Sequence, residues 1–220
     1  IGCHSDHPIV QRAVQFLLRT FDEQATTWRV VPTDTNSYAR ANWWHNKNGS
    51  LARTFHDYYI IPRAKIVTLF HHFSTDVPAD WLTNVTERTV SQIVEVPPSG
   101  FGDELIYALQ LVEVDDVPDH FQDRLLPLLK RITPSIVERN PDKWHKYCTP
   151  PLWVAPLPTS SMADVLRKDV QAHLDYQIAN QTPSGTWTPF WTWGNEYVDV
   201  WEIAKKEWIG HLTLETLTSL

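Results

Sequence analysis

The residues best placed to do chemistry form two short polar groups. His56 and Tyr59 stand just before an expected helix, and Glu104 lies three residues before Tyr107 on another. Residues three apart share a helix face, and hydroxyl or imidazole donors can polarise the carbonyl of an oxygenated substrate. We therefore predict these four as catalytic residues. The structural alternative is a buried Glu104 paired with Lys or Arg, and phenols that satisfy backbone groups of loops.

Tryptophan is unusually frequent, with 11 among 220 residues. Large rigid aromatic surfaces are either buried or used for recognition. The sequence therefore predicts that a hydrophobic small-molecule substrate is bound by aromatic residues in or beside irregular segments, namely Trp43, Trp44, Tyr58, Trp153, Trp191 and Trp193. The alternative, which applies above all to Trp191 and Trp193, is that these rings are part of the scaffold.

Several motifs of catalysis are missing from the sequence. It contains no D-D-x-x-D cluster, which would hold magnesium against pyrophosphate, and no nucleophile motif or Gly-rich phosphate loop. Asp142, His145 and Cys148 lie three residues apart, but a Pro-rich segment is a poor setting for a metal site. We therefore predict no metal ion and no cofactor.

The formal net charge of −7 and the pI of 5.8 do not suit a nucleic-acid partner, because affinity for phosphates comes mainly from Lys and Arg. No apolar run reaches the length of a membrane span. The two cysteines suit a reduced interior as well as one disulfide, and the sequons at Asn48, Asn84 and Asn180 exceed chance only mildly. We expect a cytoplasmic protein, with secretion the less favoured alternative; the oligomeric state stays open.

Helical periodicity dominates the chain. Apolar stripes with helical spacing begin near Pro8, Pro62, Pro78, Phe101, Pro118, Ser161 and Tyr197. Within the fifth of these segments, Pro127 and Pro134 predict a kink or a split. The sequence therefore predicts one all-α domain over residues 1–220, more than half helical, with no sheet beyond an isolated bridge.

Two segments of the chain repeat each other. Residues 10–16 and 170–176 share a pattern at a spacing of 160, and each is followed by a stretch that reaches a tryptophan, Trp28 in one case and Trp187 in the other. This arrangement predicts units of helix, aromatic turn and helix, placed as hairpins around an axis.

The second copy carries a recognisable motif. Gln181, Gly185 and Trp187 match Q-x-x-x-G-x-W, and the chain resembles the small single-domain members of the terpenoid cyclase and protein prenyltransferase superfamily. The Gln amide can bond exposed backbone groups, the Trp ring stacks over it, and Gly permits the turn. In the first copy, Asp22 and Thr26 stand where Gln and Gly would be expected.

The resemblance implies a partial α/α toroid of helical hairpins with long aromatic-rich loops, similar to compact fungal cyclases that include norbornene-forming Diels–Alderase proteins. It implies a metal-independent intramolecular cyclase of an apolar isoprenoid-derived substrate, most simply by a [4+2] cycloaddition that depends on substrate folding and carbonyl polarisation.

Three alternatives remain open at this point. The segment Glu113–Asp116 is one carboxylate type away from the D-x-D-D proton donor of class II cyclases, so Asp115 or Glu104 could start the reaction by protonation. The chain could instead be a noncatalytic toroid that binds an isoprenoid lipid or a partner. Carbohydrate-active α/α barrels also place Trp platforms beside carboxylates.

Overall fold

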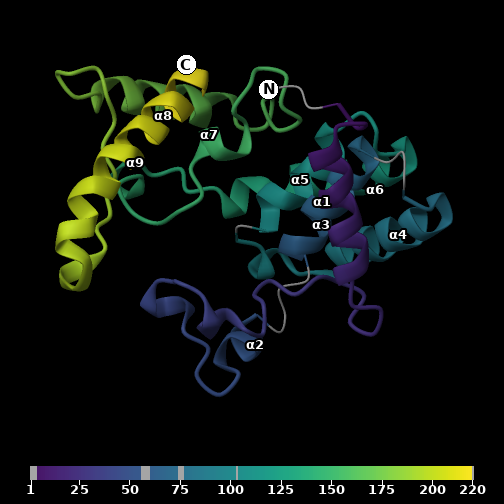
Figure 1. Cartoon of the computed structure of the whole chain (residues 1–220). Helices are drawn as coiled ribbons and strands as arrows, with labels where there is room; N and C mark the ends of the chain where they lie inside the picture. Colours follow the sequence, from purple (N-terminus) through teal and green to yellow (C-terminus); the bar gives the residue numbers. More distant parts are fainter. Residues whose placement is uncertain (1–3, 56–59, 74–76, 103, 220) are drawn as a thin grey trace. The chain divides into compact units, whose positions relative to one another are not determined.

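The computed structural model describes residues 4–55, 60–73, 77–102 and 104–219 (Figure 1). Over these residues, α- and 3₁₀-helices make up 63%, there is no strand, and one isolated bridge joins Asp22 to Thr27. The prediction of an all-α chain with at most an isolated bridge is confirmed. The chain divides into two compact units, Ile1–Leu129 and Lys130–Leu220. The single domain over 1–220 stays a prediction.

The first unit is built from α1 (Pro8–Thr20), α2 (Ser50–Thr54), α3 (Ile60–His72), α4 (Ala79–Glu95), α5 (Glu104–Glu113) and most of α6 (Asp119–Ile136). Helix α3 packs against both α4 and α5. The largest side chains of the core are fully buried and come from these helices: Phe70, Ile93, Leu105, Leu111, Phe121, Leu125 and Leu129. The periodic stripes of the sequence therefore form one packed interior.

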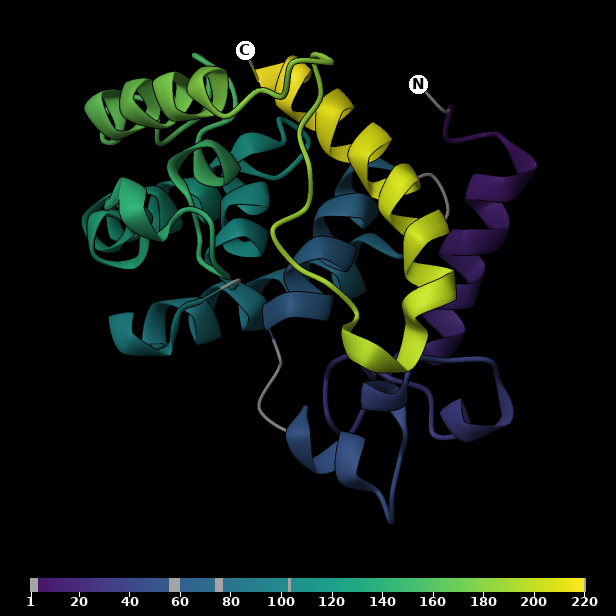
Figure 2. The same cartoon turned by 90° about the vertical axis from the view of Figure 1, so that its left-hand side faces the viewer.

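The second unit contains the end of α6, then α7 (Pro151–Val154), α8 (Arg167–Ala179) and α9 (Val198–Ser219), which is drawn in yellow in Figure 2. Short 3₁₀ turns lie at Pro141–Lys143 and Gly194–Tyr197 in this unit, and at Thr35–Ser37, Asn42–Trp44 and Pro98–Gly100 in the first. Helix α8 begins at Arg167, later than the Ser161 cap predicts. Helix α6 runs through Pro127 and Pro134 as one helix, so of the expected kink or split the split does not occur.

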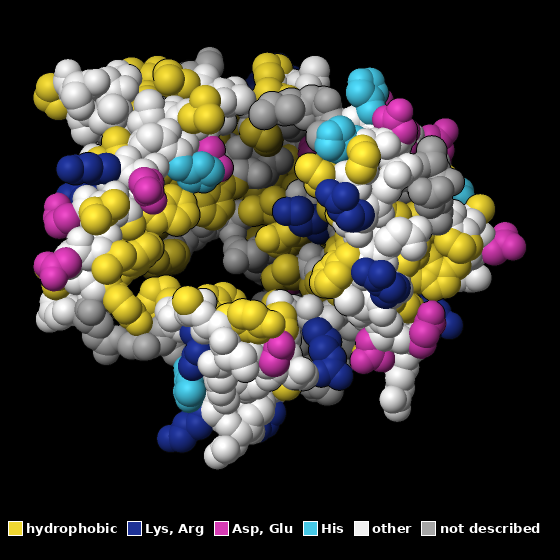
Figure 3. Space-filling view, viewed as in Figure 1, with side chains coloured by type: hydrophobic (Ala, Val, Ile, Leu, Met, Phe, Trp, Pro, Cys, Tyr) yellow, Lys and Arg dark blue, Asp and Glu magenta, His cyan; other side chains and the backbone are white. Residues whose placement is uncertain are grey.

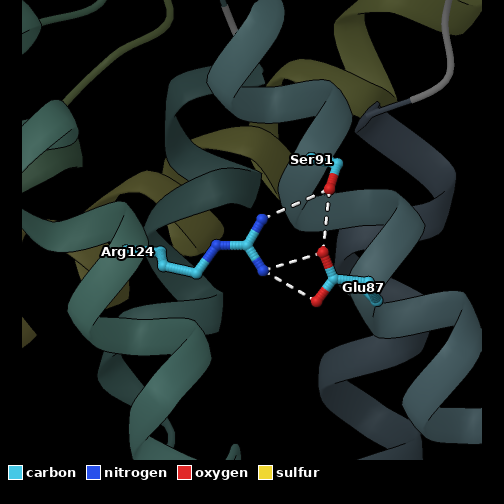
Figure 4. Close-up of polar contacts among 3 residues, drawn as sticks. All are labelled: Glu87, Ser91 and Arg124. Carbon is cyan, nitrogen blue, oxygen red and sulfur yellow. Dashed lines mark hydrogen bonds and ion pairs between the residues drawn. The ribbon is translucent and has the colours of Figure 1, made fainter.

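A three-residue cluster ties α6 to α4 (Figure 4). Nη1 of Arg124 donates to both carboxylate oxygens of Glu87 at 2.8 and 2.7 Å, and its Nη2 donates to Ser91 Oγ at 3.2 Å. Ser91 Oγ donates in turn to Glu87 at 2.9 Å. These donors lower the pKa of Glu87. Since both charged side chains are well exposed, the cluster fixes the register of the helices more than it stabilises the fold.

The Q-x-x-x-G-x-W motif forms one turn, as predicted, and we call residues 181–187 the second turn. Gln181 Nε2 donates to the carbonyl of Gly185 at 3.1 Å, and Gly185 has a φ of +79°. Trp187 is 6% exposed, and its indole N–H donates to the carbonyl of Gln177 at the end of α8, at 2.9 Å. Its backbone N–H donates to Thr213 of α9 at 3.3 Å. The motif thus joins three segments of the second unit.

The first copy, residues 22–28, forms a matching turn that we call the first turn. Trp28 is 4% exposed, and its indole N–H donates to the carbonyl of Leu17 near the end of α1, at 2.6 Å. Thr26 has a φ of +52°, the same left-handed conformation as Gly185. The side chain of Asp22 accepts from the backbone of Gln24 and Ala25, at 3.1 and 2.9 Å, and leaves the carbonyl of Thr26 to another group.

That other group is Arg63 of α3. It is 2% exposed, donates from Nη1 to the carbonyl of Thr26 at 3.0 Å, and hydrogen-bonds Gln92 of α4 from Nη2. Helices α1 and α8, which precede the turns, are both 13 residues long. From Trp28 to Trp187 the structural repeat is 159 residues, one fewer than the sequence pattern suggests.

Candidate functional site

The site that best combines apolar walls with polar groups lies in the irregular segment between α1 and α2. The 3₁₀ turns Thr35–Ser37 and Asn42–Trp44 fold this segment around a hollow of about 330 Å³, which we call the Trp44 hollow. It is lined by Val30, Val31, Pro32, Thr35, Tyr38, Ala39, Arg40 and Trp44. Trp44 stacks on Phe55 with ring centroids 5.7 Å apart. Figure 3 shows hydrophobic side chains with Lys and Arg beside them on this part of the surface.

Arg40 is the cation of the hollow and is held firmly in place. Its Nη1 donates to the carbonyls of Asn36 and Tyr38 at 2.9 and 3.0 Å, and its Nη2 lies 2.7 Å from Nδ1 of His45. Because a guanidinium only donates, His45 Nδ1 is the acceptor in this contact. Nε of Arg40 is buried without a hydrogen-bond partner. Two reciprocal bonds of 2.9 Å between Asn36 and Asn46 close the segment.

The predicted catalytic residues do not come together at the hollow. His56 and Tyr59 lie outside the described residues. Glu104 is the first residue of α5, and its Oε2 accepts the backbone N–H of Gly102, which precedes the helix, at 2.9 Å. Tyr107, also on α5, has the Lys65 ammonium 5.9 Å from its ring centroid. Neither Glu104 nor Tyr107 lines the hollow, and a structural explanation covers both.

The six predicted binding aromatics also separate. Tyr58 lies outside the described residues. Trp44 lines the hollow, whereas Trp43 and Trp153, 58% and 54% exposed, do not. Trp191 packs edge-to-face on Trp208 at 5.3 Å, and Trp193 lies 5.4 Å from Trp201. The last two pairs join the loop before α9 to α9 itself, which favours the scaffold alternative for Trp191 and Trp193.

No family model, curated protein or solved structure matches the chain. The candidate site is therefore judged on its own geometry. Over the described ranges, no group of three or more His, Cys, Asp or Glu residues is arranged to hold a metal ion, and no helix is long and apolar enough to cross a membrane.

The acidic segment before α6 faces solvent. Asp115 and Asp116 are exposed in a turn, and Asp116 accepts from His72 Nδ1 at 2.7 Å. The neighbouring His71 bonds Thr86 at 2.9 Å, and its pKa is lowered mainly by burial. One histidine is thus packed and the other exposed, as their positions on different helix faces predict. Such a solvated segment is a poor place for a strong proton donor.

Helix α8 contains a buried histidine that no sequence motif indicates. His173 is 2% exposed and packs edge-on against Trp144, with ring centroids 4.6 Å apart, and parallel to Tyr176 at 6.0 Å. Its Nε2 lies 3.3 Å from the amide nitrogen of Gln177, while Nδ1 is buried without a partner. Burial lowers the pKa of His173 to about 4. The imidazole is closed off from any ligand and is therefore a feature of stability.

Tyr38 and Arg40 are the functional candidates that sequence reasoning missed. The available signal was the apolar run Val30–Pro32, followed within ten residues by a phenol and an arginine. Neither side chain belongs to a motif, and they meet only because two 3₁₀ turns fold the segment back on itself.

Proposed function

We propose that the protein binds an apolar, isoprenoid-derived small molecule in the Trp44 hollow and promotes its intramolecular cyclisation without a metal ion. The observation that carries this proposal is the combination, in one hollow, of aliphatic and aromatic walls with the Arg40 guanidinium and the Tyr38 ring. The hollow has a volume of about 330 Å³ and is open to solvent, so it would hold part of such a molecule rather than enclose it. The partial α/α toroid expected from the Q-x-x-x-G-x-W motif belongs to the same proposal.

The proposed reaction is a [4+2] cycloaddition, in which the protein needs to supply shape and polarisation. Apolar walls hold a flexible polyene in a folded conformer and so remove rotational freedom before the reaction. A positioned donor on a substrate carbonyl then stabilises the charge that develops in the transition state. Arg40 and Tyr38 are the donors of the hollow, in place of the predicted Glu104 and Tyr107.

A second candidate is a noncatalytic protein that binds the same class of molecule. It is favoured by the position of Glu104, because Oε2 of this carboxylate already accepts the backbone N–H of Gly102. Proton-initiated cyclisation is less favoured than either, since Asp115 is exposed to water.

The test is incubation of the purified chain with carbonyl-bearing polyenes, with and without EDTA, followed by chiral analysis of the products. We expect enantioenriched cyclic product in both conditions, and a loss of about tenfold in rate for Trp44→Ala, whereas the exposed Trp153→Ala serves as the matched control. Saturable binding without product would select the noncatalytic candidate. Recovery of activity by an added metal after chelation would contradict the metal-independent reaction.

A further inference from the structure

The Trp44 hollow carries a positive charge that the described part of the chain does not neutralise. The hydrogen-bond partners of Arg40 are two backbone carbonyls and the imidazole of His45, and none of them is a carboxylate. Asp34 precedes the lining residue Thr35, and its carboxylate accepts from the hydroxyl of Tyr38 at 3.4 Å. No described carboxylate forms an ion pair with Arg40.

The surroundings of this charge are apolar. The other walls of the hollow are Val30, Val31, Pro32, Ala39 and the Trp44 ring, besides Thr35 and Tyr38. A charge beside low-dielectric walls attracts an opposite charge more strongly than the same charge in open water. The nitrogens of Arg40 also differ in their occupation. Nη1 is used twice by backbone carbonyls and Nε is buried, whereas Nη2 has one contact, to His45, so the donor that remains for a ligand is the second N–H of Nη2.

We propose that the ligand of the Trp44 hollow is an amphipathic carboxylic acid, whose apolar chain packs on Trp44 and Val30–Pro32 and whose carboxylate pairs with Arg40. This inference rests on the proposed function and names its ligand class. A single guanidinium neutralises one negative charge, and the remaining Nη2 N–H can donate to one oxygen of a carboxylate. The carboxylate would supply the counter-charge that Arg40 lacks among the described side chains.

The inference is tested by competition against Nile red, a neutral fluorescent probe, bound to the full chain. The competitors are farnesoic acid and farnesol, which share one apolar chain and differ in the carboxylate. We expect the acid to displace the probe at a concentration at least tenfold lower than the alcohol. This ratio should fall below threefold in Arg40→Gln and fall with added salt, because salt screens the ion pair.

Two further variants separate the outcomes. Arg29→Gln removes an exposed arginine from the same segment and should keep the wild-type ratio. Arg40→Lys keeps the charge and should keep a ratio above threefold, so it tests the charge even if loss of the Arg40 contacts to backbone carbonyls impairs folding of Arg40→Gln. Equal displacement by acid and alcohol, both abolished in Trp44→Ala, would overturn the carboxylate and leave the proposed function standing. Displacement by neither competitor would overturn the proposed function itself.

Discussion

The first turn and the second turn reach the same geometry with different residues. In both, an indole N–H closes on a carbonyl near the end of a 13-residue helix, and the residue two before the tryptophan has a positive φ. In the second turn the donor to the Gly185 carbonyl comes from within the turn, because Gln181 supplies it. In the first turn the donor to the Thr26 carbonyl comes from another helix, because Arg63 of α3 supplies it. In both turns the carbonyl of the residue with positive φ has a hydrogen-bond donor, but the donor comes from a different part of the chain in each.

The largest effect should come from the tryptophans. Trp28→Ala should destabilise the fold by about 4–5 kcal/mol and Trp187→Ala by about 3–4 kcal/mol, since both are large-to-small core changes. The difference arises because the Trp28 ring also packs edge-to-face on Phe21, Phe70 and Trp81. Urea unfolding followed by circular dichroism measures both, with exposed Trp43→Ala as the control. If Trp187→Ala abolished activity without lowering the melting temperature, its role would not be structural.

The donors of the two turns should rank next. Arg63→Met should cost about 2–3 kcal/mol, because it leaves the part-buried carbonyl of Thr26 and the side chain of Gln92 without a charged donor. Gln181→Met should cost only about 1 kcal/mol, since the second turn is exposed at Gln181 and water can replace the amide. Thermal unfolding of the two variants beside wild type makes the comparison. Equal losses would mean that the two donors are not counterparts.

The helices before the turns differ in one buried residue, Val14 in α1 and His173 in α8. Because the pKa of His173 is lowered to about 4 from 6.5, the unfolded chain binds more protons between these values. Stability from this group is therefore complete above about pH 6.5 and is lost as the pH falls towards 4. Between pH 7 and 5 the loss should be about 1–2 kcal/mol.

The variant His173→Leu places an aliphatic side chain in α8 where α1 has Val14. The free energy of unfolding of the variant should change less between pH 7 and 5 than that of wild type, by the same 1–2 kcal/mol. Other histidines titrate equally in both proteins, so the difference isolates His173. Parallel pH profiles of the two proteins would contradict the assignment.

The smallest effects, of opposite sign, should come from the left-handed positions. Gly185→Ala should cost about 1 kcal/mol, because a φ of +79° is unfavourable for a residue with a Cβ. Thr26→Gly should stabilise the chain by about 0.5 kcal/mol, as relief of the strained threonine exceeds the added freedom of the unfolded chain. Calorimetric melting temperatures of both variants test the signs. A destabilising Thr26→Gly would show that the Thr26 side chain has a role of its own.

The sequence predicted the helices well because apolar periodicity is a local signal. The starts expected near Pro8, Pro78, Pro118 and Tyr197 agree with the observed helices within a residue. The spacing to Trp28 also placed Asp22 and Thr26 at the Gln and Gly positions of the first copy. Arg63 was out of reach, since its bond to Thr26 spans 37 residues and leaves no local trace.

The candidate site was predicted less well. Trp44 was expected as a binding residue and does line the hollow, but Arg40 and Tyr38 reach it through turns that apolar periodicity does not describe. Glu104 was expected to act in chemistry because it shares a helix face with Tyr107. In the structure, Oε2 of Glu104 instead accepts the backbone N–H of Gly102, two residues earlier in the chain.

The boundary between the two compact units lies within helix α6. The division between Leu129 and Lys130 falls inside a helix of 18 residues rather than in a linker, where domain boundaries commonly lie. A protease needs an extended, locally unfolded substrate strand, and a helix interior does not offer one without first opening. During limited proteolysis, cleavage in the irregular segments should therefore occur much earlier than cleavage at this boundary. Fragments cut at residue 129 would begin or end with a frayed half-helix whose apolar side chains have lost their neighbours along the chain.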